Sequence, residues 1–361
     1  MSALRRSTLL RSLLIAVVAA LVLFGISELV GEYRNSQLAS VALNFCAIAG
    51  LTVLIGRSGQ VSLGHGAFLF VGGYTVALML KHHTFPNSPT TNKLFILALL
   101  VAVAVSAAVG ALAGLAAARL RGPYLAGVTL ALALGLPELP TYSHLSGWLG
   151  GHTGLVVNIP NSLDNVDFAR WQAWICCACA VITLFLLYNL IHSRVGRAFE
   201  AVRDDEVAAS LAGLSVARVQ VLAFVVSAAA AGLAGGLYAL TAGQVDPLSF
   251  PLTLSLDLLA ASVIGGLGTL SGAAYGAVLI TFLPSWAQDV SGLSATSKVG
   301  ANLPTTIFGL ALVVSMLLLP NGIQGLLSSI TRRLRNGAAP MHRTAFGISS
   351  RAGNLHDRED T

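Results

Sequence analysis

Long apolar runs separated by short polar stretches fill this chain from near its first residue to about residue 320. A helix needs about 20 apolar residues to cross the hydrocarbon core of a bilayer, and ten runs approach or reach that length. The pattern predicts an all-α integral membrane protein, a polytopic bundle of about ten transmembrane helices. The runs cover residues 12–30, 41–56, 61–80, 94–118, 123–137, 174–191, 219–242, 253–269, 272–287 and 303–319.

Two features of these runs make the number of predicted spans smaller than ten. The run 123–137 is short and ends in Pro137, with Pro140 following, which predicts a broken or tilted helix. The runs 253–269 and 272–287 are separated only by a glycine-rich turn. The prediction is therefore eight to ten spans.

Composition supports a membrane protein and excludes other classes. Hydrophobic residues make up 55% of the 361 residues and charged residues only 10%, against about 25% in soluble domains. The mean hydropathy is +0.78. These values exclude a cytosolic enzyme, a disordered chain and a disulfide scaffold. The net charge of +6 comes from basic residues at the borders of apolar runs, so it does not indicate a nucleic-acid partner.

The positions of the basic residues predict the orientation, because cytoplasmic loops are rich in Lys and Arg. With ten spans and the N-terminus inside, five of the 21 Lys and Arg residues fall outside: Arg34, Lys81, Lys93, Arg170 and Lys298. We therefore expect both termini in the cytoplasm. The predicted parts are an N-terminal segment 1–11, a transmembrane domain 12–330 with outer loop 138–173 and inner loop 193–218, and a disordered tail 331–361.

The inner loop has the residue order of a short helix rather than of a plain connection. Asp204 or Asp205 can cap this helix. Acidic residues in its first turn, including Glu206, are stabilised there by the helix dipole. Gly213 can close it in the left-handed conformation. Ser215 is then placed to cap the next span.

The same helix carries an apolar stripe. Val207 and Leu211 are four residues apart and share one face, while Ala208 and Ala209 favour the helical conformation. Such a helix suits docking into a groove on a partner protein, and it equally suits lying in the lipid headgroup region. Spacing alone leaves both interpretations open.

Glycines punctuate the third predicted span and the eighth and ninth spans. Glycine lets helices approach closely in lipid, and it also permits a broken helix whose polar groups line a cavity. Each of these residues also has an interpretation without a role in transport. The glycines can serve only helix packing, and His65 can be a neutral histidine in the core. Asp257 can lie near the outer interface. The candidate pathway residues are Gly59, Gln60, Ser62, Gly64, His65, Asp257, Gly265 and Gly266.

Four stretches, in order along the chain, resemble the branched-chain amino-acid ABC transporter permease family, in particular its LivM-like subunit. EVAASLAG at 206–213 looks like the EAA loop of ABC importer permeases, within a longer similar run at 203–239. The other stretches are GRSGQVSLGHGAFLFVGGYTVALML at 56–80, GGHTGLVVNIP at 150–160 and VIGGLGTLSGAAYGA at 263–277.

The resemblance implies a cytoplasmic coupling helix that inserts into an ATPase subunit. It also implies the partners: two ABC ATPase subunits, a second homologous permease subunit and an extracytoplasmic solute-binding protein, besides membrane lipid. ATP and Mg²⁺ would bind to the ATPase subunits, and this chain has no phosphate-binding GxxxxGK[ST] loop of its own. The implied coupling residues are Arg203, Asp204, Asp205, Glu206, Ala208, Ala209 and Gly213.

Other functional classes compete with this interpretation. The GxSG order at 56–59 is found in intramembrane serine proteases, but no later span contains the histidine base that such chemistry needs. Ion-coupled transporters usually carry several intramembrane carboxylates or histidines, and this chain has little beyond Asp257. Within the resembled family, branched-chain amino acids are the expected solutes, with urea or short amides as the alternative.

Overall fold

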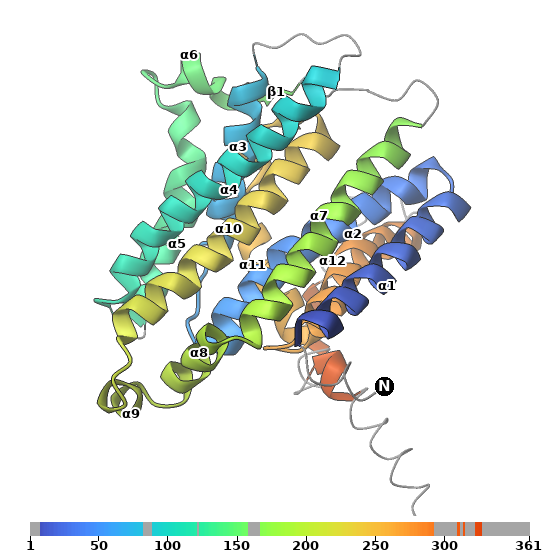
Figure 1. The fold of residues 1–361 in the computed structure, drawn as a ribbon. Coiled ribbons are helices and arrows are strands. Elements are labelled where there is room, and N and C mark those ends of the chain that lie inside the picture. The colour runs from blue at the N-terminus through green and yellow to red at the C-terminus, as the bar shows by residue number, and fades with distance from the viewer. Residues whose placement is uncertain are drawn as a thin grey trace, which may run out of the picture.

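The chain forms a bundle of long helices in the computed structural model (Figure 1). The structure describes residues 8–81, 89–120, 123–157, 167–291, 309–310, 313–314 and 322–326. Its long helices are α1 (Thr8–Leu29), α2 (Glu32–Thr52), α3 (His65–Leu80), α4 (Pro89–Ala117), α5 (Pro123–Glu138), α7 (Phe168–Ile191), α8 (Arg194–Asp204), α10 (Val216–Ala242), α11 (Leu252–Gly265) and α12 (Leu270–Ser291). Short elements are α6 (Ser146–Leu149), α9 (Glu206–Leu211), β1 (Leu155–Val156) and β2 (Gln244–Val245).

The predicted all-α membrane fold is confirmed in this coarse form. Seven helices in the described part of the chain are long and apolar enough to cross a membrane. Two shorter apolar helices, His65–Leu80 and Leu270–Ser285, accompany them. The predicted run 303–319, the first seven residues and the tail 331–361 lie wholly or largely outside the described residues.

The second span begins earlier than predicted, at Glu32 rather than at residue 41. The polar residues after Glu32 suggested a loop, but Asn35 is buried and bonded within the α1–α2 hairpin. Its amide nitrogen donates to the carbonyls of Ser27 and Val30, and its oxygen accepts from the Ser27 hydroxyl at 2.9 Å. Because these partners satisfy the buried amide, a polar helical turn is stable there.

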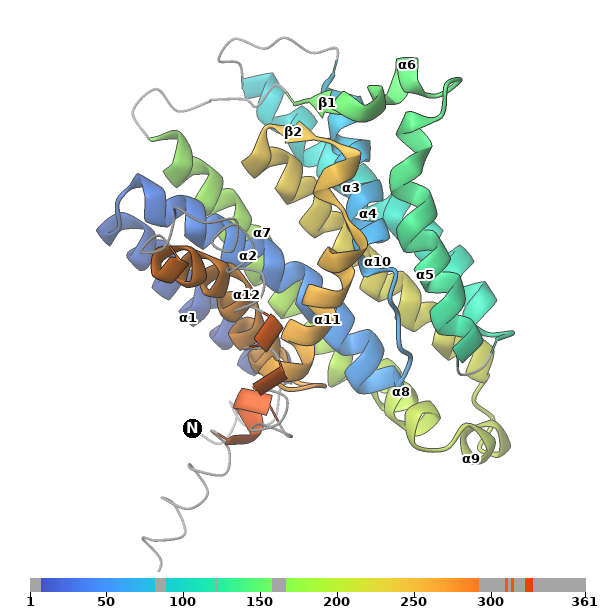
Figure 2. The same ribbon diagram turned by 180° about the vertical axis from the view of Figure 1, so that it is seen from behind.

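The third span is not the continuous helix predicted over 61–80. α2 ends in a π-helical turn, Val53–Arg57, and Gly59 then adopts a positive φ of 72°. The next residues run without helical structure to Gly64, and α3 starts only at His65. In Figure 2 this stretch lies between α5 and α11. We call residues 58–64 the extended segment.

α10 lies at the centre of the bundle, packed against α3, α4 and α2. Glycines make these contacts close. A methyl group at Gly72 of α3 would overlap the backbone of Gly232, and one at Gly235 of α10 would overlap the Leu69 carbonyl. Ser106 of α4 donates to the Phe68 carbonyl of α3 at 3.2 Å. Small residues therefore bring three helices to backbone contact, as expected where apolar burial alone does not drive association.

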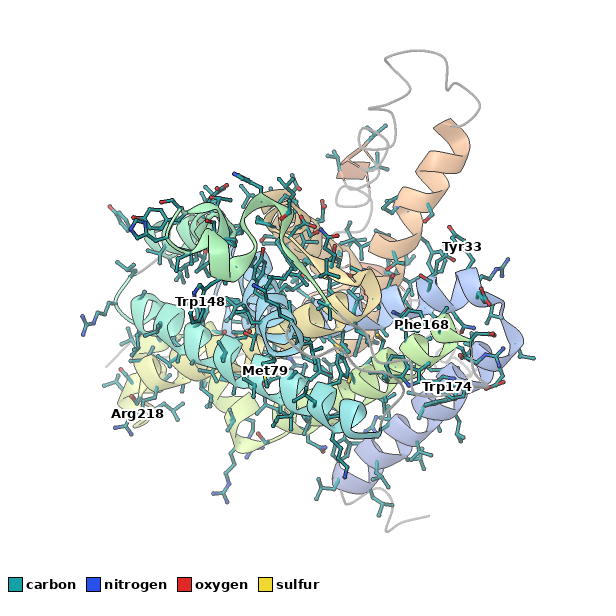
Figure 3. The ribbon with its side chains drawn as sticks, turned by 90° about the horizontal axis from the view of Figure 1, so that it is seen from above. Tyr33, Met79, Trp148, Phe168, Trp174 and Arg218 are labelled. Atoms are coloured by element: carbon teal, nitrogen blue, oxygen red, sulfur yellow. The ribbon has the colours of Figure 1, made fainter. Side chains whose placement is uncertain are left out.

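The two ends of the bundle differ in structure (Figure 1). One end carries α8, α9 and the start of α1, and the other carries α6 and β1. At the second end β1 pairs antiparallel with β2, Leu155 opposite Val245, so the predicted outer loop is tied to the chain that leads into α11. Viewed from above, Tyr33, Phe168 and Trp174 lie on one side of the molecule and Trp148 on the other (Figure 3).

We expect Gly235→Ala to destabilise the bundle, because the added methyl group has no space at the α3–α10 contact. Overpacking of this kind costs about 1–3 kcal/mol. Gly25→Ala in α1 is the matched control, because a methyl group there meets no atom of the described structure within 4 Å. Thermal unfolding in detergent should show a lower midpoint for Gly235→Ala alone. Equal midpoints for the two variants would contradict the close packing.

Candidate coupling and translocation site

The inner loop folds into two helices, α8 and α9. α8 begins at Ser193, whose hydroxyl accepts from the Val195 amide at 3.1 Å. It lies on the bundle through Phe199 and Val202, which are both buried. An apolar face on an otherwise charged helix explains why α8 lies against the bundle rather than in solvent. Asp204 ends α8, and Asp205 adopts an extended conformation before α9 starts.

α9 is a single capped turn at the far tip of this end (Figure 1). Between the two acidic residues considered for the cap, the structure selects Asp205. Its carboxylate accepts from the amides of Val207 at 2.8 Å and Ala208 at 3.0 Å. Gly213 closes the turn at a φ of 87°, in the left-handed region as predicted. Ser215 occupies the N-cap position of α10, but its side chain makes no capping hydrogen bond, contrary to the prediction.

The predicted apolar stripe of α9 faces outwards. Val207 is 68% exposed and Leu211 is 85% exposed, whereas Ala209 is buried beneath them. Glu206 accepts from the Gln220 amide at 3.0 Å, which ties α9 to α10. α9 is therefore held from two sides and presents two apolar side chains away from the bundle.

Arg203, a predicted coupling residue, makes contacts with the bundle. Its guanidinium donates to the Gly56 carbonyl at 2.7 Å and to the Asp204 carboxylate at 2.9 Å. Its aliphatic part covers Gly59, where a methyl group would come within 2.7 Å of the Arg203 side chain. Arg203 thus connects α8 to the turn from which the extended segment starts.

Arg57 makes a second connection at the same turn. It forms an ion pair with Glu200 of α8, and its Nε donates to the Gly268 carbonyl at 2.8 Å. Gly56 lies against the backbone of Gly268, with no room for a side chain. α8, the end of α2 and the α11–α12 turn are therefore joined through two arginines.

Four of the candidate pathway residues lie in the extended segment, and His65 follows it. Gln60 is only 7% exposed, yet neither atom of its side-chain amide has a hydrogen-bond partner among the described residues. Ser62 accepts from the Gly64 amide at 3.3 Å. The His65 ring lies 2.8 Å from the Ala47 carbonyl through Nε2, while Nδ1 has no partner in the described part of the chain.

Two neighbouring helices support the start of α3. Thr129 of α5 accepts from the Leu63 amide at 3.1 Å, and Ser255 of α11 accepts from the Gly66 amide at 2.9 Å. The start of α3 therefore lies beside Ala47, ten residues before Arg57 along the chain.

Asp257, Gly265 and Gly266 lie on or next to α11, apart from the extended segment. Asp257 is partly buried six residues beyond Pro251, the N-cap of α11, and the structure records no hydrogen bond or ion pair for it with a described residue. Gly265 lies against the backbone of Gly272 in α12, and Gly266 lies near Gln324. The two glycines therefore serve close packing at this turn.

The GxSG sequence at 56–59 does not form a protease site. The Ser58 hydroxyl is buried and donates to the Leu54 carbonyl at 2.6 Å, so it is not held by a base. The described residues contain no group of three or more His, Cys, Asp or Glu side chains placed to hold a metal ion. The site consists of hydrogen-bonding groups and helix ends, without a nucleophile–base pair at Ser58.

Sequence analysis missed Arg57, Glu200, Thr129 and Ser255 as parts of this site. In the sequence, Arg57 counts only among the basic residues that predict the orientation. Its position between Gly56 and Gly59, where a helix is prone to break, is the signal of a further role. Thr129 and Ser255 carried no such signal, because hydroxyl groups in apolar helices usually bond to their own backbone.

Comparisons with known proteins identify the family of this chain. A family model described as "Branched-chain amino acid transport system / permease component" matches residues 34–319. The high-affinity branched-chain amino acid transport system permease protein LivM of Escherichia coli K12 is 31% identical over 320 residues, which cover 80% of this chain and 69% of that protein. The LivH permease protein of the same system and strain is 27% identical over 49% of this chain and 52% of its own length.

A relative named for another solute is also similar. The autoinducer 2 import system permease protein LsrC of Enterobacter sp. strain 638 is 30% identical and covers 77% of this chain and 82% of that protein. No solved structure matches the chain. The family match covers most of the apolar helices and both ends of the broken span. The chain therefore belongs to the branched-chain amino-acid ABC transporter permease family, a family of multi-pass inner-membrane transport subunits that are not themselves enzymes.

Proposed function

We propose that this chain is the membrane-spanning subunit of an ATP-driven importer for branched-chain amino acids or related small polar solutes. The observation that carries the proposal is α9, a capped helix with two exposed apolar side chains that is joined through α8 to a broken span. Two separate ABC ATPase subunits would bind ATP and Mg²⁺ and act on α9. A second, homologous permease subunit and an extracytoplasmic solute-binding protein would complete the importer.

The proposed orientation places α8, α9 and both termini in the cytoplasm. The binding protein would then release its solute near α6 and the β1–β2 pair. A polar solute needs hydrogen-bonding groups across the hydrocarbon region, because that region contains no water to solvate it. The extended segment supplies such groups, and its candidate pathway residues are Gly59, Gln60, Ser62, Gly64 and His65. Asp257 would contribute from α11, whereas Gly265 and Gly266 lie in the packed α11–α12 turn.

The mechanism is alternating access driven from the cytoplasmic end. ATPase closure would move α9, and α8 would follow because the two helices meet at Asp205. Arg203 and the Arg57–Glu200 pair would transmit this motion to the turn at Gly56 and to the start of the extended segment. The polar groups of that segment would then face the opposite side of the membrane.

The solute class rests on the family rather than on a measured ligand. LsrC is named for autoinducer 2 at an identity close to that of LivM, so about 30% identity does not fix the solute. The affinity of the importer's solute-binding protein for leucine, urea and acetamide, measured by calorimetry, would decide between these solutes. Binding of urea or acetamide alone would replace the amino-acid assignment by the short-amide alternative.

We expect Leu211→Asp to weaken association with the ATPase subunits about tenfold or more, because a charge replaces an apolar side chain at the centre of the contact. Leu248→Asp is the matched control: Leu248 is 82% exposed, as Leu211 is 85% exposed, but it lies at the opposite end of the bundle. Co-purification of ATPase with the tagged permease is the measurement. Equal recovery of the ATPase with both variants would show that α9 does not form the contact with the ATPase subunits.

We expect Arg203→Ala to uncouple the importer while leaving it assembled. The variant loses the charge-assisted bond to the Gly56 carbonyl, worth about 1.5–3 kcal/mol, which corresponds to roughly a tenfold or larger loss of uptake. Arg197→Ala is the control, because Arg197 is exposed on the same helix. Uptake and ATPase activity are measured in proteoliposomes. Normal uptake by Arg203→Ala would argue against transmission through this contact.

We expect Gln60→Leu to lower uptake and to raise thermal stability. The change removes a buried amide that has no partner among the described residues, and such a group costs about 1–3 kcal/mol. Gln172→Leu is the control: Gln172 is 6% exposed, but its amide donates to the Leu240 carbonyl at 2.7 Å, so its loss should lower stability. Uptake and melting midpoints are measured for both. A Gln60→Leu protein that melts lower would mean that the amide has a structural partner.

A further inference from the structure

The extended segment turns back along α2. The backbone amide of Gln60 donates to the Leu54 carbonyl at 3.2 Å, and the His65 ring lies 2.8 Å from the Ala47 carbonyl. Leu54 and Ala47 are seven residues apart, so they lie on one face of α2. Both belong to the candidate membrane span Glu32–Arg57. The segment therefore lies beside a membrane helix, where each polar group needs a partner.

Burial alternates along this segment. Gly59 and Val61 are exposed, whereas Gln60 and Ser62 are buried. Side chains on an extended backbone point alternately to opposite sides. The alternation therefore turns the polar side chains of Gln60 and Ser62 towards the bundle and the apolar side chain of Val61 away from it. The side of the segment that faces the bundle is its polar side, and we call it the inner face.

The Gln60 amide is the group on the inner face that most clearly lacks a partner. The residue is 7% exposed, and neither its amide nitrogen nor its amide oxygen bonds to a described residue. Gln172 of α7 shows the usual arrangement: it is 6% exposed, and its amide donates to the Leu240 carbonyl at 2.7 Å. An unpaired buried amide destabilises the conformation that contains it. Gln60 therefore keeps a donor and an acceptor available for a ligand that pairs with both.

His65 adds a second acceptor at the end of the segment. A carbonyl oxygen only accepts hydrogen bonds, so the Nε2 atom that faces the Ala47 carbonyl carries a proton. In the neutral ring, Nδ1 is then an acceptor, and this atom is buried without a partner among the described residues. Unpaired groups of both kinds thus accompany the segment.

The charged side chains that hold the start of the segment are already paired. Arg57 forms an ion pair with Glu200. Arg203, which covers Gly59, donates to the Asp204 carboxylate at 2.9 Å. Because these charges are compensated within the chain, neither arginine offers a free charge to a ligand on the inner face.

The carboxylate of α11 does not add a charge at the other end. Ser255 of α11 accepts from the Gly66 amide at 2.9 Å, which marks the side of α11 that faces the start of α3. Asp257 follows two residues later, about 200° around the helix from Ser255. A solute with a net charge would lose its hydration at the inner face without gaining a counter-charge. The inner face therefore suits a solute whose net charge is zero.

We propose that the Gln60 amide selects the solute within the permease, by pairing with one donor and one acceptor of a solute that has no net charge. An amino-acid zwitterion satisfies it through its carboxylate and ammonium groups, and a primary amide through its C=O and N–H groups. This inference rests on the proposed function. It adds that the permease discriminates between solutes, besides the solute-binding protein.

The test measures binding of labelled leucine to the purified complex of both permeases and the ATPases, without the solute-binding protein. Three competitors share most of the carbon skeleton of leucine: isocaproamide is neutral, isocaproate is an anion and leucinamide is a cation. We expect isocaproamide to compete with leucine, and the two charged compounds to compete about tenfold less well or worse. Competition by isocaproate or leucinamide equal to that of isocaproamide would overturn selection by net charge.

A variant of Gln60 tests the residue itself. Gln60→Glu keeps the volume, replaces the N–H donors by an acceptor and adds a negative charge. We expect leucine to bind about tenfold more weakly or worse, and leucinamide to bind better than leucine, since its ammonium group meets the new charge. Gln172→Glu, at an equally buried position, should keep the preference for leucine. An unchanged preference in Gln60→Glu, or the same reversal in Gln172→Glu, would overturn the role of Gln60.

ATP-driven uptake separates this inference from the proposed function. Proteoliposomes containing the complex are supplied with the solute-binding protein and with leucine, urea or acetamide. Uptake of any of the three, without saturable leucine binding by the purified complex, would overturn the inner face as a solute site and leave the importer in place. Absence of ATP-driven uptake of all three solutes would instead overturn the proposed function.

Discussion

The hydrogen-bonding requirement of backbone in lipid is the constraint on which the rest of this structure depends. A continuous helix would satisfy the backbone amides and carbonyls within the third span, but its backbone would then have no free hydrogen-bonding groups for a polar solute. The chain instead stops α2 at a π-helical turn and begins α3 only at His65, whose ring lies 2.8 Å from the carbonyl of Ala47 in α2. Each exposed polar group then needs a partner, and the surrounding helices are arranged to supply some of these partners and to leave others available.

The partners divide into two kinds. Thr129 and Ser255 hold the upper part of the break and belong to membrane helices. Arg203 and Arg57 hold the part nearer Gly56 and connect it to α8. Under the proposed function, a motion of α8 would act on these attachments, while Thr129 and Ser255 would hold the start of α3 in place. This difference would suit the extended segment to act as a gate that is moved from one end.

Much of the fold follows from the hydrophobic pattern, but the break does not. The capped helix at α9 was predictable because Asp205 and Gly213 act locally, through their own backbone. The run 61–80 is uniformly apolar apart from short polar residues, so periodicity cannot distinguish an extended piece from a helix there. The partners of that piece come from α5, α8 and α11, and such tertiary contacts are not encoded in local spacing. Gly232 and Gly235 were likewise missed, because their contacts lie on other helices.

The distribution of glycine indicates which parts of the bundle are fixed and which are available. In the α3–α10 contact, glycines meet backbone directly, and no side chain can be added without moving a helix. On α5, Gly127 and Gly135 meet nothing in the described structure. Glycine therefore lies in a close helix–helix contact in α3 and α10, and on a surface without such a contact in the described part of α5. Because glycines on an exposed helix give up side-chain contact with lipid, Gly127 and Gly135 leave α5 open to close approach by another helix.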